Sequence, residues 1–332
     1  MEASRETEWT MASEPPGVGW RDPVRVLSID GGGIRGVIPT MVLAELETRT
    51  GTATSALFDL IAGTSIGGII ALCMAVPGEH GEPAWSAREL IGVFERAASE
   101  IFVPAGHSVL HGVLHQRYGS ENIEGTLVRY LGSRRISEAL CDVLVTAYDV
   151  SAREPYFINS IAAQLDAGHD MPMWMAGRST SAAPTYFEPA QLPAPKQRVM
   201  LDGGVCANNP AMCAFAEVVK YRHSFDMKIV SLGTGSSTRA MAHHEVKDWG
   251  LAQWARPILH VLMDGASDVV HRQLREMLPE DAYWRLQVRL AHASESIDDA
   301  THKNLADLMA EGERLIKSAD RELDAICETL SL

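Results

Sequence analysis

The chain has 332 residues, of which 46% are hydrophobic and 22% charged, a composition typical of a globular protein with a sizeable core. Its formal net charge of -14, with no cluster of lysine and arginine, argues against nucleic acid as a partner. An anionic membrane would repel the same charge, so contact with lipid is expected to depend on apolar insertion, a local patch or a weakly charged bilayer.

The first 22 residues form a polar leader rather than a secretory signal. They include Glu2, Glu6 and Glu8 and lack the apolar core of a signal peptide. The five cysteines are odd in number and lack zinc or redox spacing, which favours reduced thiols, no metal and a cytoplasmic location. The longest apolar run, around residues 69–76, is far shorter than the roughly 20 residues that a membrane-spanning helix needs.

Two strand–loop–helix units open the folded part of the chain. The β-rich run 24–29 predicts a strand, which is followed by a glycine cluster and a helix to about residue 47. The run 57–62 predicts a second, buried strand, with a sharp turn over 63–67 and a helix over 68–75. Two such units in succession favour an α/β layer fold.

The middle of the chain alternates short strands with helices, and its end is mostly helical. Strands are expected at 142–148, 155–159, 199–201 and 228–232, and helices at 86–99, 123–131 and 210–221. From Trp249 onward the pattern is mostly helical, and apolar positions among charges predict an amphipathic helix over 303–330. We therefore divide the chain into a leader (1–22), a core (23–236) and a mainly helical C-terminal part (237–332) packed on the same domain.

The second turn carries a candidate nucleophile. Gly63-Thr-Ser65-Ile-Gly67 matches G-x-S-x-G, in which the glycines let a strand-to-helix turn tighten and expose the serine hydroxyl. The strand predicted before the motif and the helix predicted after it supply the context that this function requires. The alternative is a glycine-rich turn with a capping serine.

The first turn, Asp30-Gly-Gly-Gly-Ile-Arg-Gly36, carries a candidate anion site, because consecutive glycines at a helix N-terminus expose backbone N–H groups. The anion is either a nucleotide phosphate, since the glycines satisfy G-x-G-x-x-G, or the oxyanion of an acyl-transfer reaction. A dinucleotide site expects an acidic residue at the end of the second strand, where Ser65 stands instead. No G-K-[ST] follows the glycines, which argues against a P-loop.

Asp202 closes another predicted strand at a turn that contains glycines. A carboxylate within hydrogen-bond reach can take the proton of a serine, although an aspartate in a plain turn is the alternative. A conventional triad would need a histidine, and this possibility stays open on the residues alone. The twelve histidines stand outside any motif, which favours surface or loop positions; among them are His80, His107, His111, His115, His243, His244 and His260.

Five segments together resemble the patatin-like phospholipases and stand in the order of that family. The resemblance spans roughly residues 24 to 236. The five segments are Asp30 to Pro39, Phe58 to Gly68, Thr180 to Phe187, Asp202 to Pro210 and Val230 to Gly235.

The resemblance implies a three-layer α/β/α fold with a central, mostly parallel sheet and a Ser65–Asp202 dyad without histidine. It also implies an oxyanion hole formed by the backbone of Gly31, Gly32 and Gly33, and neither a metal nor a cofactor. Arg35 stands nearby, either as a contact for a phosphate of the substrate or in an internal salt bridge that shapes the loop.

The function that the resemblance implies is hydrolysis of fatty acyl esters of (phospho)lipids, of the phospholipase A or lysophospholipase type, with peripheral contact to the inner membrane. The rivals are an acyltransferase and a catalytically idle protein that binds a phosphate or nucleotide. Some bacterial members of the family are cell-killing effectors switched on by a nucleotide second messenger. A cyclic-nucleotide activator and a role in antiviral defence are therefore further expectations. The oligomeric state stays open, because the C-terminal amphipathic helix fits either a dimer or packing on the core of its own chain.

A stretch between two predicted helices is interpreted as a lid. Residues 101–110, with Val113 and Leu114, are apolar and occupy a place where lipases commonly keep a lid or a membrane-touching element. The alternative is a loop and helix packed on the core.

Overall fold

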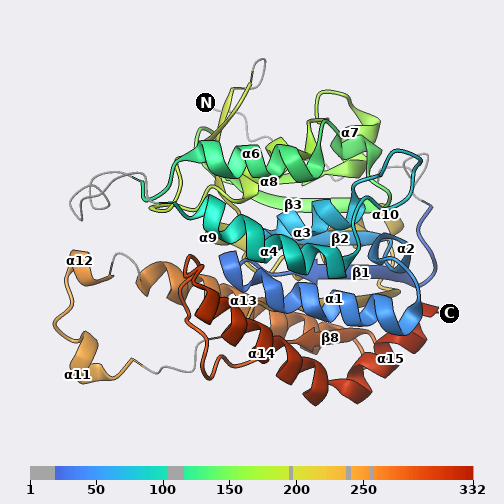
Figure 1. Cartoon of the computed structure of the whole chain (residues 1–332). Helices are drawn as coiled ribbons and strands as arrows, with labels where there is room; N and C mark the ends of the chain where they lie inside the picture. The colour runs from blue at the N-terminus through green and yellow to red at the C-terminus, as the bar shows by residue number, and fades with distance from the viewer. Residues whose placement is uncertain (1–18, 104–115, 194–196, 237–240, 255–256, 332) are drawn as a thin grey trace, which may run out of the picture.

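An eight-stranded sheet runs through the centre of the molecule between two layers of helices (Figure 1). The computed structural model describes residues 19–103, 116–193, 197–236, 241–254 and 257–331. The strands follow the order β5-β6-β3-β2-β1-β7-β8, and β4 pairs with β3 beside this path. Their bounds are β1 Val24–Ile29, β2 Leu60–Thr64, β3 Asp142–Asp149, β4 Glu154–Asn159, β5 Ala190–Leu192, β6 Arg198–Asp202, β7 Met227–Leu232 and β8 Tyr283–Leu286.

The strands β8, β7, β1, β2 and β3 are parallel, whereas β4 and β6 run antiparallel to β3 and β5 runs antiparallel to β6. Every residue of β1 and of β2 is buried, because helices cover both faces of a parallel sheet. Successive side chains alternate between the two faces: Leu27 and Ile29 enter one core, and Val24 and Val26 the other. The predicted three-layer α/β/α fold with a mostly parallel sheet is confirmed.

One helical layer is built on α1, which packs against α4 and α14, while α4 packs against α6 and α6 against α8 (Figure 1). The helix α3 lies directly on β1, β2 and β3. The helices of this part are η1 Gly33–Gly36, α1 Val37–Thr50, α2 Thr54–Leu57, α3 Ile66–Ala75, α4 Ala87–Ile101, α6 Ser120–Leu131, η2 Ile136–Glu138, α8 Met173–Thr180, α14 His302–Ser318 and α15 Asp320–Ser331.

The other face of the sheet is covered by α10, which contacts β1, β2 and β7, and by α13, which contacts α10 and β8. The apolar side chains of α10 form a second core with those of β1, β2 and β7. The remaining helices are α7 Ser160–Leu165, α9 Gly204–Ala207, α10 Ala211–Arg222, α11 His243–Val246, α12 Leu251–Trp254 and α13 Pro257–Met277.

The residues after 236 contribute to the sheet as well as to the helical layers. The pattern there indicated a mostly helical chain and did not predict β8, which extends the sheet parallel to β7. Helices α14 and α15 both contact α1. The C-terminal part therefore packs on the same sheet as the segments that carry the glycine and serine motifs.

For two of the expected elements, side-chain contacts accompany the change in boundaries. The strand predicted at 57–62 begins only at Leu60, because Thr54 starts the short helix α2 and donates its N–H and its hydroxyl to Glu47 Oε1 at 3.0 and 2.7 Å. The helix predicted over 303–330 is divided at Ala319 into α14 and α15. Arg49 of α1 forms ion pairs with Asp320 and Asp324 at the start of α15. These pairs hold α15 against α1, as α14 is.

Most of the stretch interpreted as a lid lies outside the described residues, since only 101–103 belong to them. Ile101 ends α4. None of the described helices combines the length and the apolar composition that crossing a membrane would require.

Candidate active site

Ser65 lies on a strained turn between β2 and α3. Its φ of 55° and ψ of -124° are unusual for a residue with a side chain, and its N–H donates to Thr180 Oγ1 at 2.8 Å. A Cβ atom at Gly63 would lie 2.2 Å from the carbonyl oxygen of Gly67, and one at Gly67 would lie 2.2 Å from that of Ile29. Both flanking glycines of the motif are therefore needed for the backbone to approach this closely.

Asp202 reaches Ser65 from the opposite direction along the sheet. Strand β3 continues past the end of β2, since Thr64 pairs with Thr146 and three further residues of β3 follow. The antiparallel strand β6 pairs with this extension and ends where Asp202 lies opposite Ala147. The geometry brings Ser65 Oγ to 2.6 Å from Asp202 Oδ2, a short hydrogen bond.

The environment of Asp202 makes its carboxyl a better base than a free aspartate. Its side chain is buried, and its second oxygen, Oδ1, accepts the N–H of Gly204 at 2.7 Å. Burial raises the pKa of Asp202 from 3.8 to about 6, although the hydrogen bonds from Ser65 and Gly204 lower it in part. The carboxylate is still ionised at neutral pH and can take a proton in hydrogen-bond contact with it.

Among the described residues, no histidine forms a hydrogen bond with Ser65 or with Asp202. His80, His243 and His244 are exposed, and His260 of α13 is half-buried. Electrostatic neighbours of His260 include Arg35 and Asp264. The other named histidines, His107, His111 and His115, lie outside the described residues.

The glycine loop lies against Ser65, and two of its amides have no acceptor among the residues that the structure describes. The Gly31 N–H donates to the carbonyl oxygen of Asn208 at 3.1 Å, whereas the N–H groups of Gly32 and Gly33 find no acceptor in the described part of the chain. A Cβ atom at Gly31 would lie 3.3 Å from Ser65 Cβ, which shows how closely loop and serine approach. Of the three amides that the resemblance implies for an oxyanion hole, that of Gly31 is already paired, and the role of Gly32 and Gly33 stays a prediction.

Gly33 has a φ of 57°, and a Cβ atom there would lie 2.1 Å from the carbonyl oxygen of Ile297. That same carbonyl accepts the N–H of Ile34 at 2.9 Å. Only glycine fits this position, which the segment before α14 covers. The sequence motif marked Gly33, but nothing in the local pattern pointed to Ile297.

Arg35 is buried beneath the loop and braces it. Its guanidinium donates to the carbonyl oxygens of Gly32 and Gly235, each at 3.3 Å, and its exposed fraction is 5%. Burial lowers its pKa, while the nearby Asp264 and Glu295 raise it. These contacts agree with a role in shaping the loop, and the phosphate contact stays a prediction.

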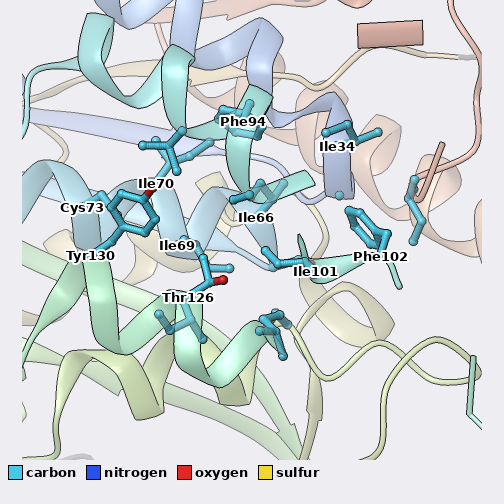
Figure 2. Close-up of a pocket in the computed structure, with 18 of the residues that line it drawn as sticks. Ile34, Ile66, Ile69, Ile70, Cys73, Phe94, Ile101, Phe102, Thr126 and Tyr130 are labelled. Carbon is cyan, nitrogen blue, oxygen red and sulfur yellow. The ribbon is translucent and has the colours of Figure 1, made fainter. Parts of the chain in front are cut away.

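An almost entirely apolar cavity extends from Ser65 between α3, α4 and α6 (Figure 2). Its volume is about 120 Å³. Cys73, eight residues after Ser65 in α3, also lines it, so that the cavity follows this helix for about 12 Å. Side chains of the three helices form its walls, among them Ile66, Ile69, Ile70, Phe94, Leu127 and Tyr130.

A second, small opening also borders Ser65. Its lining includes Asp202, Gly204, Val205, Met263 and Pro184. Both spaces touch Ser65, and because Val205 beside the smaller one is exposed, we interpret that space as the entrance to the site. Met263 belongs to α13, a part of the chain in which the sequence pattern marked no site residue.

Within the described ranges no group of three or more histidine, cysteine or acidic side chains is arranged to hold a metal ion. Cys73 lies in the cavity wall, where burial raises the pKa of its thiol to about 12. A thiol with such a pKa is protonated at neutral pH and is a poor nucleophile.

Comparisons with known proteins relate the chain to the patatin-like proteins. The sequence model of the patatin-like phospholipase family matches residues 27–215. The chain is similar to Patatin-like protein 1 of Oryza sativa subsp. indica, at 30% identity over 88% of this chain and 81% of that protein. It is also similar to Patatin-like protein 2 of Arabidopsis thaliana, at 30% identity over 95% and 88%.

Two further similarities complete the comparison. Probable inactive patatin-3-Kuras 1 of Solanum tuberosum is 27% identical over 90% of this chain and 88% of that protein. The crystal structure of VipD from Legionella pneumophila aligns with 90% of this chain and 67% of that chain, at 11% identity and a TM-score of 0.40.

Proposed function

The chain belongs to the patatin-like phospholipase family, a family of lipid acyl hydrolases, and from this premise we propose that it hydrolyses fatty acyl esters of membrane lipids with Ser65 and Asp202. The observation that carries the proposal is the hydrogen bond of 2.6 Å between Ser65 Oγ and Asp202 Oδ2 at the mouth of an apolar cavity.

In the first half-reaction, Asp202 takes the Ser65 proton while Ser65 Oγ attacks the ester carbonyl carbon. The negative charge that develops on the carbonyl oxygen is stabilised by the N–H groups of Gly32 and Gly33, which carry no other acceptor among the described residues. The proton on Asp202 passes to the leaving alcohol as the C–O bond breaks. The fatty acyl group then remains attached to Ser65 as an ester.

In the second half-reaction, Asp202 takes a proton from water, and the resulting hydroxide attacks the acyl-enzyme. The same two amides stabilise the second oxyanion, and the proton returns to Ser65 Oγ as the fatty acid leaves. The acceptor distinguishes this reaction from that of an acyltransferase, in which an alcohol or a lysolipid replaces the water.

The cavity supports a fatty acyl substrate. Its walls are the apolar side chains of α3, α4 and α6, and it begins at the hydroxyl that would carry the acyl group. Burial of methylene groups against such walls contributes roughly 0.8 kcal/mol each. We therefore propose that the acyl chain lies along α3 while the rest of the lipid stays at the opening near Val205.

The test is the release of free fatty acid from mixed phospholipid vesicles by wild type, Ser65→Ala and Asp202→Asn. We expect both variants to lose at least about a hundredfold in rate while their melting temperatures show that they are folded. Ser331→Ala, at the exposed end of α15, is the matched control and should retain full activity. Release that persists in Ser65→Ala would contradict the proposed nucleophile.

Two rivals are separated in the same assay. Transfer of the acyl group to an added lysolipid, in place of free fatty acid, would indicate an acyltransferase. No reaction with vesicles or soluble esters would indicate the catalytically idle protein that binds a phosphate or nucleotide. The similarity to Probable inactive patatin-3-Kuras 1 is the reason to test for this outcome. Nucleotide second messengers added in parallel test the expected activator, since a gated effector would release fatty acid only with one of them.

We also propose a cytoplasmic protein that contacts the inner membrane peripherally when active. Support comes from the five cysteines, all of which are free thiols in the structure. Cell fractionation with and without the activating ligand tests this location, and a protein found outside the cell would contradict it.

A further inference from the structure

One face of α13 is apolar and exposed along its first three turns. Its residues recur at the spacing of a single helix face, i, i+3, i+4, i+7 and i+11, and Leu262 has the most exposed of its large side chains, at 61%. The residues of this face are Ile258, Val261, Leu262, Gly265 and Val269. The opposite face, which includes Met263, Ser267 and Leu274, is buried against the body of the protein.

This face continues into the entrance of the candidate active site. Met263, next to Leu262 in the chain, lines the opening in front of Ser65 and Asp202. α9 packs against α13, and its Val205 lines the same opening and is itself exposed. A surface that touches the α13 face would therefore also touch the rim of the entrance.

The charge around the face selects the kind of surface that it can touch. No described residue of the face is charged, and the nearest acidic residues on α13 are Asp264, half-buried, and Asp268, exposed. With the net charge of -14, these groups oppose approach to an anionic surface. They leave contact with an uncharged or zwitterionic one unaffected at physiological salt.

A tryptophan pair precedes α13 in the chain. Trp249 and Trp254 meet edge-to-face, with ring centroids 5.1 Å apart, and both are half-buried. Trp254 ends α12, which contacts α13. Tryptophan is enriched where proteins meet the headgroup region of a bilayer, because its ring is apolar and its N–H is polar.

We propose that the α13 face, together with Val205, docks on the surface of a zwitterionic lipid bilayer and so presents lipid to the entrance in front of Ser65. The proposal rests on the proposed function, which makes a bilayer lipid the substrate. The apolar side chains enter the headgroup region, and Asp268 disfavours membranes rich in anionic lipid. Lipid can then pass from the bilayer to Ser65 without crossing water.

The test measures binding separately from hydrolysis. Ser65→Ala protein is sedimented with phosphatidylcholine vesicles, with and without the pair Val261→Ser/Leu262→Ser. We expect the pair to weaken binding about tenfold or more. Leu165→Ser on α7 and Met277→Ser at the far end of α13 make similar changes at exposed apolar positions and should bind like the parent. Unchanged binding of the Val261→Ser/Leu262→Ser variant would overturn the proposal.

Three further results test which kind of surface the α13 face binds. Binding to phosphatidylcholine should not change with salt, and Asp268→Lys should raise binding to vesicles with phosphatidylglycerol several-fold at low salt. Parent protein that binds anionic vesicles more strongly than phosphatidylcholine would contradict the docking mode. A dimer in light scattering that Val261→Ser/Leu262→Ser converts to a monomer would assign the face to a second copy of the chain.

The two proposals fail in different ways. If wild type hydrolyses no ester while the α13 variants still lose vesicle binding, the docking surface stands and the proposed function fails. If vesicle hydrolysis depends on Ser65 but the α13 variants bind and hydrolyse like the controls, only the docking surface fails. Where docking holds, the α13 variants should keep their rate on a soluble ester and lose about tenfold on vesicles.

Discussion

Arg285 of β8 holds Asp30, the residue before the glycine loop, through two hydrogen bonds of 2.8 and 2.5 Å. Both side chains are buried, and Arg285 also donates to Ser231 Oγ in β7 at 2.9 Å. The N–H of Asp30 donates to the carbonyl oxygen of Leu232. The position of the loop in front of Ser65 therefore depends on a strand more than 200 residues away in sequence.

Arg285→Met should destabilise the fold by about 3–5 kcal/mol at pH 7.5, because it leaves the carboxylate of Asp30 buried without its partner. The double variant Asp30→Asn/Arg285→Met should recover part of that loss, since no charge is then buried. Urea unfolding of the two single variants and the double variant measures this coupling. Purely additive losses would show that the pair is not the cause.

The turns that carry the site residues could be predicted from the sequence, but the contacts between residues far apart in sequence could not. Ser65 and the glycine loop lie in turns that a strand precedes and a helix follows, and this context is visible in hydrophobic periodicity. β8 has only four residues, Tyr283–Leu286, which is too few for a clear pattern. The ion pair between Asp30 and Arg285 could therefore not be predicted. The same holds for the packing of Ile297 against Gly33.

Asp202 illustrates the same limit within a motif that the sequence marked. Its strand end was visible, but its approach depends on β6 running antiparallel to the extension of β3, a tertiary arrangement. Thr180 stood at the start of a family segment without an assigned role. Its role follows only from the packing of α8 beside the turn of Ser65.

Thr180 should be a positioning residue for the nucleophile. Its hydroxyl accepts the Ser65 N–H at 2.8 Å and donates to the carbonyl oxygen of Thr146 at 2.6 Å. Thr180→Val keeps the shape and leaves both buried groups unpaired, which costs roughly 1–3 kcal/mol and releases the strained turn. We expect kcat to fall about tenfold or more while KM changes little, and Thr180→Ser to stay near wild type. Equal rates for the two variants would contradict this role.

Cys73 should limit the length of the acyl chain, since it lines the cavity about two helical turns beyond Ser65. Cys73→Leu adds bulk there and should lower kcat/KM for long-chain esters about tenfold while leaving short-chain esters unaffected. Cys213→Leu, a partly buried cysteine on α10 outside the cavity, is the control. Equal losses on long and short esters would indicate general damage to the core rather than a limit on chain length.

The raised pKa of Asp202 predicts a pH dependence of the reaction. The carboxyl must be ionised to take the proton of Ser65, and its pKa is raised to about 6. The value of kcat/KM should therefore be constant above pH 7 and fall about tenfold per unit below pH 6. Steady-state rates on a soluble ester from pH 4.5 to 8.5 measure this limb. A fall in kcat/KM that begins only near pH 4 would mean that the carboxylate required for activity is not that of Asp202.

The raised pKa of Asp202 also predicts that its ionised carboxylate lowers the free energy of unfolding at neutral pH. Below pH 3.8 the carboxyl is protonated in both the folded and the unfolded chain, so it makes no difference to the free energy of unfolding. As the pH rises towards 6, the unfolded chain ionises first, and the wild type loses stability until the folded carboxyl ionises too. A pKa raised from 3.8 to about 6 corresponds to about 3 kcal/mol.

Asp202→Asn removes this ionisation and still offers an oxygen to the hydroxyl of Ser65 or the N–H of Gly204. We expect the variant to be inactive yet more stable than wild type by up to about 3 kcal/mol at pH 8, with the difference vanishing towards pH 4. Asp248→Asn, at an exposed position, should show no such trend. Chemical unfolding at several pH values decides the matter: a difference that does not vary with pH would mean that burial of the Asp202 charge does not destabilise the fold.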